Sequence, residues 1–367
     1  MAEDKLRIGI VGATPGVGWG PRAHIPAYRA LPEVELVAVC TAHPETAQAA
    51  AKEFSVPRYF TDYQELVGSP DIDAVSVVTR ILLHYPVSKA ALEAGKHVYC
   101  EWPLTVTSQQ ASELAELARS KGLRNTTGLQ SRFAPPFLRM KELLEEGYIG
   151  RPLTFHMSMF GAGALQPRPS PYAFIARKDS GAGALTIAGG HSIDALCWLL
   201  GDIEALSARV DAQISEWTLP DTKQQVPVTT PDNVGFAARL KNGAVGTVQI
   251  SNTAVAGSGF SLEVYGDRGK LSARSNGLLE LSLVRLSGAQ AGEAEGEIPV
   301  PERLVEVPGL GLDSPAYNIA QLFRNFVRGT RAARDLSPTF AEGARLHRVL
   351  EAVDRSSQTR SWVTVDA

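Results

Sequence analysis

The sequence has 367 residues, 44% hydrophobic and 20% charged, the balance of a globular protein large enough for two domains. Its formal net charge of −3 at pH 7 predicts no surface that attracts nucleic acid or an anionic membrane. No run approaches the roughly 20 apolar residues of a membrane helix, and no signal-peptide core is expected. Cys40, Cys100 and Cys197 stand far apart in apolar stretches, which favours free thiols and a cytoplasmic location.

Short apolar segments alternate with helical ones in the first third of the chain. Strands are expected at residues 6–11, 34–41, 74–79 and 97–100, and helices at 23–31, 44–53, 63–67, 86–94 and 107–121. The last of these helices has a capping-type start, Thr107 with Gln110 three residues on. Strands that are apolar throughout and alternate with helices are typical of a parallel sheet covered on both faces. We therefore predict a doubly wound α/β Rossmann domain over residues 1–127.

Beyond residue 150, apolar and polar residues alternate within short segments separated by tight turns. Strands are expected at residues 152–160, 205–214, 233–240, 245–253, 260–265, 270–275 and 278–286. A polar loop at 287–300 and helices at 314–329 and 339–357 complete the chain. Such alternation predicts a large, mainly antiparallel sheet with one face covered. We assign residues 128–367 to an α+β domain and expect the ligand in the cleft between the domains.

A glycine-rich segment, residues 12–20, follows the first predicted strand and leads into a helix. Glycines at this turn let backbone amides approach a pyrophosphate at a helix N-terminus, although the spacing departs from G-x-G-x-x-G. The alternative is a turn that only packs the helix on the sheet. The residues of this segment expected to bind a dinucleotide are Gly12, Thr14, Gly16, Gly18 and Trp19.

The end of the second strand bears on the choice of coenzyme. An acidic residue there would bind the ribose hydroxyls and favour NAD, but the sequence has Thr41 and no obvious arginine for a 2′-phosphate. The cofactor is therefore predicted as NAD or NADP. Thr79, His84 and Gln130 follow other strands of the sheet and are expected to line the coenzyme site, His84 without a catalytic role.

Three motifs together resemble the glucose–fructose oxidoreductase, inositol dehydrogenase and MocA (Gfo/Idh/MocA) family. They are the glycine loop leading into residues 23–27 (AHIPA), residues 90–104 (AALEAGKHVYCEWPL), and residues 183–194 (GALTIAGGHSID) followed by a helix. The resemblance implies a Rossmann domain, a second domain whose sheet forms a dimer or tetramer, and NAD(P)-dependent hydride transfer on sugars or cyclitols. It also implies that Glu101 and Pro103 shape the coenzyme cleft and that His191 and Asp194 face the nicotinamide and substrate.

The sequence departs from the family pattern at two positions. The family's Glu-Lys-Pro motif has a lysine near the reacting hydroxyl, where this chain has Trp102, and the family's aspartate four residues before the histidine is Ile187 here. An indole neither exchanges a proton near neutral pH nor offers a positive charge. Gly18-Trp19 and Glu-Trp-Pro resemble the branch that includes the fungal galactose-regulon repressor, a regulator with this fold.

Three residues are the main candidates for the chemistry. His191 can take a hydroxyl proton while hydride leaves carbon; otherwise it packs at a helix start. Asp194 shares its helical face and would orient the imidazole or bind a substrate hydroxyl, or else complement the helix dipole. Arg132 would bind an anionic group of the substrate or coenzyme, or form a structural salt bridge between domains.

The group that replaces the missing lysine is open. Lys178 is the first suspect and Tyr172 a further proton donor, although a solvated loop lysine is the more frequent outcome. Trp102 would stack on the nicotinamide or a sugar, or fill the space of the absent lysine. No metal is expected, because no H-E-x-x-H or clustered Cys/His pattern is present.

The leading hypothesis is an NAD(P)-dependent oxidoreductase acting on a small sugar, cyclitol or glycoside, with His191 as the base. One alternative is a glycosidase that oxidises its sugar transiently, eliminates the glycosidic group and returns the hydride. The other is a non-enzymatic sensor of dinucleotide or sugar, which Trp102 and Ile187 favour.

Overall fold

The computed structural model describes residues 5–279, 281, 283–307 and 309–366. Its contacts divide the chain into two compact units, Met1–Gln130 with Glu306–Ala344, and Ser131–Val305 with Arg345–Ala367. The sequence places one boundary, at 127/128, and assigns everything after it to one domain. In the structure, residues 306–344 instead pack with the first unit, because the aromatic face of a late helix completes that unit's core.

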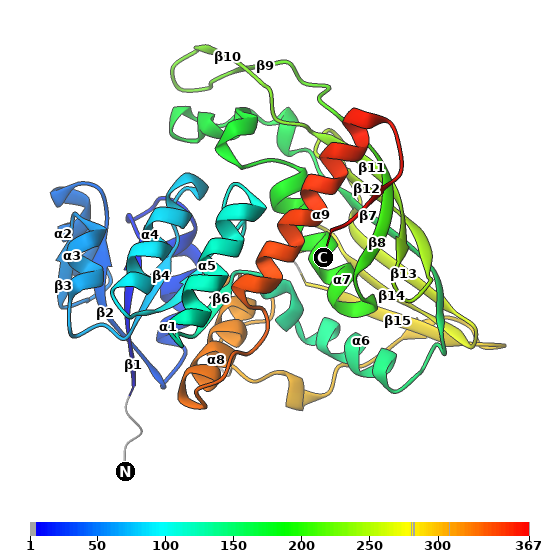
Figure 1. Ribbon diagram of the computed structural model, residues 1–367, viewed down its shortest axis with the longest axis horizontal. Helices are drawn as coiled ribbons and strands as arrows, with labels where there is room; N and C mark the ends of the chain where they lie inside the picture. Colours follow the sequence, from blue (N-terminus) through cyan, green and yellow to red (C-terminus); the bar gives the residue numbers. More distant parts are fainter. Residues whose placement is uncertain (1–4, 280, 282, 308, 367) are drawn as a thin grey trace. The chain divides into compact units, whose positions relative to one another are not determined.

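The first unit contains a parallel sheet with the strand order β3-β2-β1-β4-β5-β6 among its described residues (Figure 1). The strands are β1 (Leu6–Val11), β2 (Val34–Cys40), β3 (Arg58–Phe60), β4 (Ala74–Val77), β5 (His97–Cys100) and β6 (Asn125–Thr127). Strands β1 and β4 are buried along most of their length, as an inner parallel strand requires. The predicted doubly wound Rossmann architecture is confirmed.

Helical segments connect these strands. They are η1 (Gly20–His24), α1 (Ile25–Arg29), α2 (Pro44–Glu53), α3 (Tyr63–Gly68), α4 (Ile81–Glu93) and α5 (Ser108–Ser120), with α8 (Tyr317–Arg331) added from late in the chain. Thr107 caps α5 as predicted, since its hydroxyl accepts from the Gln110 amide at 3.3 Å. Helix α4 begins five residues before the expected start at 86, because Pro86 lies inside it rather than at its first turn.

Helix α8 contributes an aromatic face to the first unit. The Phe323 ring centroid lies 4.5 Å from that of Tyr28 on α1 and 5.6 Å from that of Tyr99 on β5. All three side chains are almost completely buried. Because Tyr28 and Tyr99 come some 200 residues or more before α8 in the chain, neighbouring sequence gives no sign of this packing.

The second unit contains a nine-stranded sheet, counted over the residues that the structure describes, with the order β16-β15-β14-β13-β7-β12-β11-β8-β17. Its strands are β7 (Pro152–Phe160), β8 (Ile203–Asp211), β11 (Asn233–Leu240), β12 (Val245–Ser251), β13 (Gly259–Gly266), β14 (Gly269–Ser275), β15 (Arg285–Gln290), β16 (Gly296–Glu297) and β17 (Val363–Thr364). Neighbours pair antiparallel except β7 with β12. The predicted α+β fold with a mainly antiparallel sheet is confirmed.

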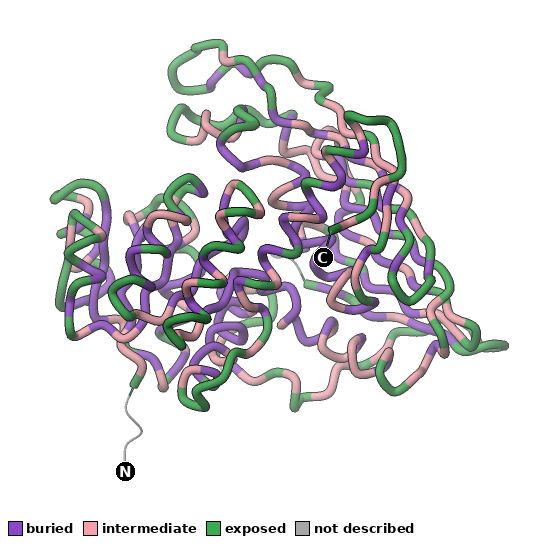
Figure 2. Tube along the Cα trace, in the orientation of Figure 1, coloured by how far each residue is buried: buried purple, intermediate pink, exposed green. Residues whose placement is uncertain are grey.

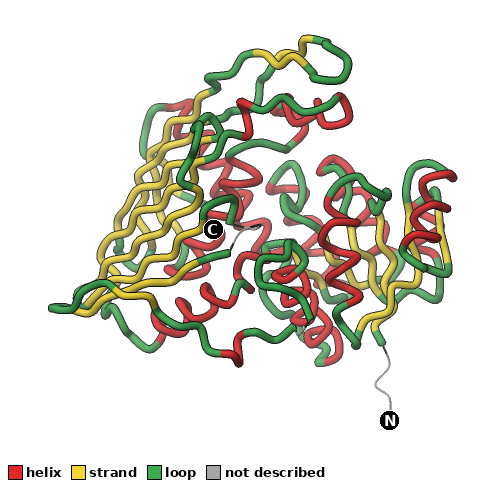
Figure 3. Tube along the Cα trace, turned by 180° about the vertical axis from the view of Figure 1, so that it is seen from behind, coloured by secondary structure: helices red, strands yellow, loops and turns green. Residues whose placement is uncertain are grey.

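Strand β13 shows how this sheet divides into two faces. Phe260, Leu262 and Val264 are buried, whereas Ser261 and Glu263 between them are half-buried. The main helices of the unit lie on one side of the sheet (Figure 3). They are α6 (Pro135–Glu145), α7 (Gly190–Leu200) and α9 (Phe340–Thr359), with shorter turns η2 (Gln130–Phe133), η4 (Ser170–Ala176), η5 (Lys178–Ser180) and η6 (Leu185–Gly189). In Figure 2 most of the first sheet is buried, whereas the strands of the second sheet mix buried residues with half-buried and exposed ones.

The region around residues 278–300 departs from the sequence prediction. The expected strand at 278–286 begins only at Arg285, and it continues as β15 to Gln290, inside the segment expected to be a loop. Residues 280 and 282 of that expected strand lie outside the described residues. The Gly and Ala residues here suggested a loop. Gly288 instead lies within a strand, at a point where a Cβ would come within 2.9 Å of Leu271 and only glycine fits. Among the described helices, none is long and apolar enough to cross a membrane.

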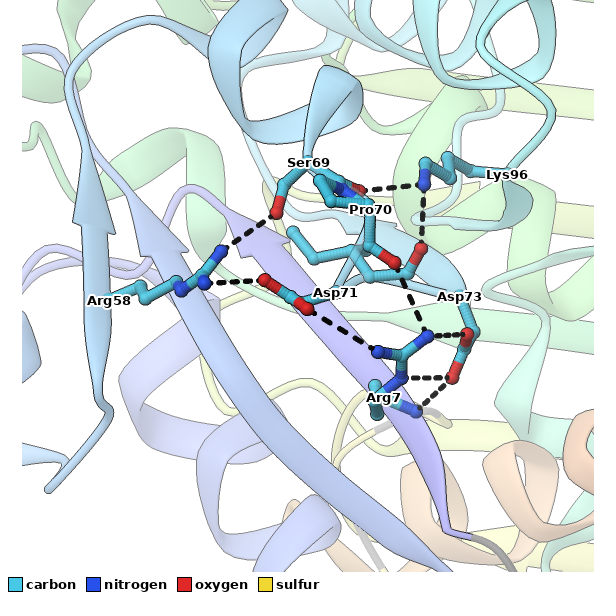
Figure 4. Close-up of polar contacts among 8 residues, drawn as sticks. Arg7, Arg58, Ser69, Pro70, Asp71, Asp73 and Lys96 are labelled. Atoms are coloured by element: carbon cyan, nitrogen blue, oxygen red, sulfur yellow. Dashed lines mark hydrogen bonds and ion pairs between the residues drawn. The ribbon is translucent and has the colours of Figure 1, made fainter.

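An ionic cluster ties together the amino ends of the strands in the first unit (Figure 4). Arg7, on β1, donates through Nε and Nη2 to the Asp73 carboxylate at 3.0 and 2.7 Å, and its backbone amide donates to the same group at 2.9 Å. Asp71 pairs with both Arg7 and Arg58. The Lys96 ammonium donates to the carbonyls of residues 69 and 72, at 2.8 Å each. The cluster lies at the edge opposite the glycine loop, so its role is structural.

We expect Asp73→Asn to lower the free energy of unfolding at pH 7 by about 1 kcal/mol, the value of a charged hydrogen bond reduced by partial exposure. Burial raises the pKa of Asp73, but the hydrogen bonds from Arg7 outweigh it and leave that pKa below its ordinary value. The carboxylate therefore stabilises the fold fully above about pH 4 and loses this effect as the pH falls through the lower folded pKa.

Urea unfolding at pH 7 and pH 3 measures this effect. The difference between wild type and Asp73→Asn should shrink at pH 3, and a difference that stays constant contradicts the prediction. Asp71→Asn is the control. Its side chain is 47% exposed, and its contacts with Arg58 and, at 3.8 Å, with Arg7 are surface ion pairs, so a smaller loss is expected.

Candidate active site

The glycine loop begins where β1 and β4 leave no room for a side chain. Gly12 has φ +105°, and a Cβ there would stand 2.1 Å from the carbonyl oxygen of Val78. Gly20, the first residue of η1, approaches the loop in the same way: its Cβ would lie 2.6 Å from the Gly12 carbonyl oxygen. These two glycines let the helix begin directly against the end of the strand.

Gly16 and Gly18, at the tip of the loop, have a different environment. Their φ angles are +69° and +81°, both are exposed, and a Cβ at either would meet no described atom within 4 Å. Positive φ and open space before the backbone are what a pyrophosphate cradle requires. Thr14 accepts a hydrogen bond from the Val17 amide at 3.1 Å, and Trp19 lies beneath the Arg22 guanidinium. The loop therefore fits a dinucleotide.

Thr41 and Thr79 follow the strands that flank β1. The buried Thr41 hydroxyl lies 2.6 Å from the Thr46 hydroxyl at the start of α2, so its hydrogen-bonding capacity is partly used within the protein. Thr79 lies beside the loop, since a Cβ on Gly12 would come within 3.1 Å of its methyl carbon. The sheet thus places Thr79 beside the glycine loop. That Thr41 and Thr79 bind the coenzyme stays a prediction.

The end of β5 holds a carboxylate with buried partners. Glu101 Oε1 lies 2.7 Å from His24 Nε2 and 2.7 Å from the Tyr99 hydroxyl. His24 and Tyr99 are fully buried, and Glu101 is 8% exposed. The sequence analysis assigns no role to His24, although it stands within the Ala23–Ala27 motif. A histidine in that motif, two residues before Pro26, is the feature of the sequence that could have pointed to it.

Trp102 and His84 lie next to this carboxylate along the chain. Trp102 is 5% exposed, which supports its expected role as a space-filling residue more than that of an open stacking plane. His84 is buried, with Nδ1 2.7 Å from the Pro103 carbonyl oxygen and Nε2 3.1 Å from that of Thr79. Burial lowers the pKa of His84 more than these carbonyls raise it. His84 therefore fastens α4 to the segment after β5, consistent with its non-catalytic assignment.

Gln130 ends the first unit and is 1% exposed. Its Oε1 atom is buried and meets no hydrogen-bond partner within the described parts of the chain. An unpaired buried amide oxygen costs free energy unless a ligand pairs with it. This supports the predicted place of Gln130 among the residues that bind the coenzyme.

In the second unit, His191 stands on the first turn of α7, directly after the π-helical turn η6. Such turns are uncommon and occur frequently at functional sites. The side chain is 3% exposed, and its Nδ1 has no hydrogen-bond partner among the residues that are described. A buried imidazole nitrogen without a partner is available to exchange a proton with a bound hydroxyl group.

Asp194 and Arg132 are brought together in a buried ion pair. The Arg132 guanidinium donates through Nε to Oδ2 at 2.8 Å and through Nη2 to Oδ1 at 2.5 Å. Both side chains are at most 6% exposed. This two-point contact fastens η2 to α7 within one unit, so it is not the salt bridge between domains considered above. It also gives each carboxylate oxygen of Asp194 a hydrogen-bond donor.

Lys178 and Tyr172 lie on short turns before η6. The Lys178 ammonium pairs with Asp354 on α9 at 3.0 Å, and its side chain is 51% exposed. That surface ion pair gives no support to Lys178 as the substitute for the family's lysine. Tyr172 is half-buried in η4, and its predicted part in the chemistry stays a prediction.

Two family models match this chain over more than half its length. Residues 6–129 match an oxidoreductase family with an NAD-binding Rossmann fold, and residues 137–272 match the GFO/IDH/MocA C-terminal domain. The chain belongs to the Gfo/Idh/MocA oxidoreductase family. The predicted nicotinamide coenzyme is thereby confirmed, and so is the assignment to a family of NAD(P)-dependent oxidoreductases.

Members of the Gfo/Idh/MocA family with different functions are similar to this chain along its whole length. Levoglucosan dehydrogenase of Pseudarthrobacter phenanthrenivorans is 27% identical over 98% of each chain. The galactose/lactose metabolism regulatory protein GAL80 of Saccharomyces cerevisiae is 26% identical over 98% of this chain and 94% of its own. A solved structure of levoglucosan dehydrogenase with NADH and levoglucosan gives a TM-score of 0.88 at 27% identity, covering 99% of this chain and 100% of that one.

We expect removal of one partner from the Arg132–Asp194 pair to cost about 3–5 kcal/mol of unfolding free energy, because it leaves an uncompensated buried charge. Asp194→Asn is the single variant, and the double variant Arg132→Met with Asp194→Leu should recover most of the loss. Urea unfolding of the three chains checks this. A double variant no more stable than Asp194→Asn contradicts it.

Proposed function

We propose that this family member oxidises a secondary hydroxyl of a sugar, anhydro sugar or cyclitol, or reduces the corresponding ketone, with His191 as the acid–base group. The observation that carries the proposal is the buried Nδ1 of His191, which lacks a hydrogen-bond partner within the described ranges. The name of the similar levoglucosan dehydrogenase supports the substrate class.

The residues of the second unit do two things in this reaction. His191 takes the proton of the reacting hydroxyl as its carbon loses hydride, and returns it in the reverse direction. The Arg132–Asp194 pair fixes the turn of α7 that carries His191. The coenzyme, when bound, accepts or returns the hydride. The residues that would hold it are the open backbone at Gly16 and Gly18 together with Gln130.

Trp102 is the main departure of this chain from the family's sequence pattern. With an indole in place of the lysine, no cation at this position polarises the reacting oxygen. Alignment of donor and acceptor supplies much of the acceleration in a two-substrate reaction, so hydride transfer does not depend on this one charge. A slower enzyme is the expected result.

A regulatory function is the second candidate, favoured by Trp102 and by the similarity to GAL80. A regulator of this kind would bind the coenzyme without turning over any sugar. Incubation with NAD and with NADP against levoglucosan, free hexoses and cyclitols distinguishes the two functions through absorbance of the reduced nicotinamide. Coenzyme binding without turnover across the whole panel favours the regulator.

We expect His191→Asn to lower kcat/KM by roughly 10²–10⁴-fold, the usual contribution of a general acid–base group, while the Kd for NADH stays within about twofold. Steady-state assays and NADH titration measure the two effects. Lys178→Met is the control and should keep activity, because its ammonium forms a surface ion pair. If Lys178→Met is as inactive as His191→Asn, the assignment of the base is wrong.

A further inference from the structure

A buried chain of polar side chains runs through the first unit from the end of β5 to the middle of β4. Glu101 Oε1 accepts hydrogen bonds from His24 Nε2 and from the Tyr99 hydroxyl. On the other side of the ring, His24 Nδ1 lies 2.9 Å from the Tyr28 hydroxyl. That hydroxyl lies 2.5 Å from the Ser76 hydroxyl. His24 and Ser76 have no exposed surface, so each contact replaces one that water would otherwise make.

The donors in this chain can be ordered from the carboxylate. A carboxylate only accepts, so Nε2 of His24 carries a proton and donates to Glu101. Burial, followed by the nearby Glu101 charge, raises the pKa of Tyr99, which therefore keeps its proton and donates to the same oxygen. Two donors from different elements thus fix one oxygen of Glu101.

These contacts join the two parts of the first unit that border the expected coenzyme. His24 is the last residue of η1, which begins at the end of the glycine loop, and Glu101 follows β5 immediately and precedes Trp102. Gly128 packs closely against the same carboxylate, since a Cβ at residue 128 would lie 3.0 Å from Cδ of Glu101. The His24–Glu101 contact is therefore a direct link between the glycine loop's helix and the end of β5.

A buried hydrogen-bonded pair that contains a carboxylate is a weak source of stability, because desolvation offsets most of its attraction and an apolar pair of similar size packs as well. Position is what such a pair adds. We propose that Glu101 is a positioning residue, which through His24 holds the glycine loop and the main chain at Trp102 in the arrangement that binds both ends of the dinucleotide. This rests on the proposed function, in which that coenzyme takes part.

The test is the Kd for NADH of the full chain, measured by calorimetry, with thermal unfolding followed in parallel. His24→Leu removes the donor to Glu101 and should weaken NADH binding by tenfold or more. His24→Gln should recover most of this loss, because its amide nitrogen lies the same number of bonds from Cα as Nε2 and donates to the same oxygen.

Tyr99→Phe is the matched control. It takes one hydrogen bond from the same carboxylate oxygen but leaves the link between η1 and β5 in place, so the Kd should stay within twofold even where the unfolding temperature falls. Glu101→Leu is the second variant, in case His24→Leu does not fold. It removes the acceptor and should weaken NADH binding as His24→Leu does.

Two results overturn the inference. One is an unchanged Kd for NADH in His24→Leu or Glu101→Leu. The other is a loss of NADH affinity in Tyr99→Phe as large, for the same fall in unfolding temperature, as the loss in His24→Leu. Neither result bears on the proposed function, since wild-type binding and turnover are measured separately. Failure of the wild-type chain itself to bind NADH or NADPH would contradict both.

Discussion

The contact between the end of β1 and the end of β4 sets the geometry on which the coenzyme half of this protein depends. The Val78 carbonyl oxygen stands where a side chain of residue 12 would begin, so the backbone at Gly12 must turn with positive φ. The turn brings η1 against the strand through Gly20 and leaves Gly16 and Gly18 facing open space. A steric constraint inside the sheet thus produces an exposed turn of backbone suited to an anion.

In both units a buried carboxylate accepts hydrogen bonds from neighbouring side chains. Asp194 and Glu101 each receive two hydrogen bonds from buried or nearly buried donors, and each joins a helical turn to a neighbouring element. His191 and Gln130 differ, since each has a buried polar atom that meets no partner among the described residues. The same holds for one atom each of Ser88, Thr127, Ser131, Ser272, Tyr317 and Arg348. Groups with partners hold the structure, and in the proposed function the unpaired atoms of His191 and Gln130 are the ones that pair with substrate and coenzyme.

Much of the fold follows from local pattern, and the failures have physical causes. Apolar runs such as 6–11 and alternating segments such as 233–240 match strands because burial on two faces or one sets their composition. Strand β15 was placed too early in the chain because Gly288 serves close packing, which composition does not reveal. At the site, the glycine loop and His191 follow from motifs. The partnership of Arg132 with Asp194 and the part played by His24 depend on distant contacts that no local pattern contains.

The place of α8 affects how the polypeptide can acquire its structure. The first unit takes residues up to Gln130 and then needs Glu306–Ala344. The ribosome therefore makes every strand of the large sheet except β17 before it releases the helix that covers Tyr28 and Tyr99. Until then the nascent Rossmann sheet exposes an aromatic face, a surface on which chaperones act and at which premature association begins. A circular permutant opened between the units, with 306–344 placed ahead of residue 5, would remove that delay.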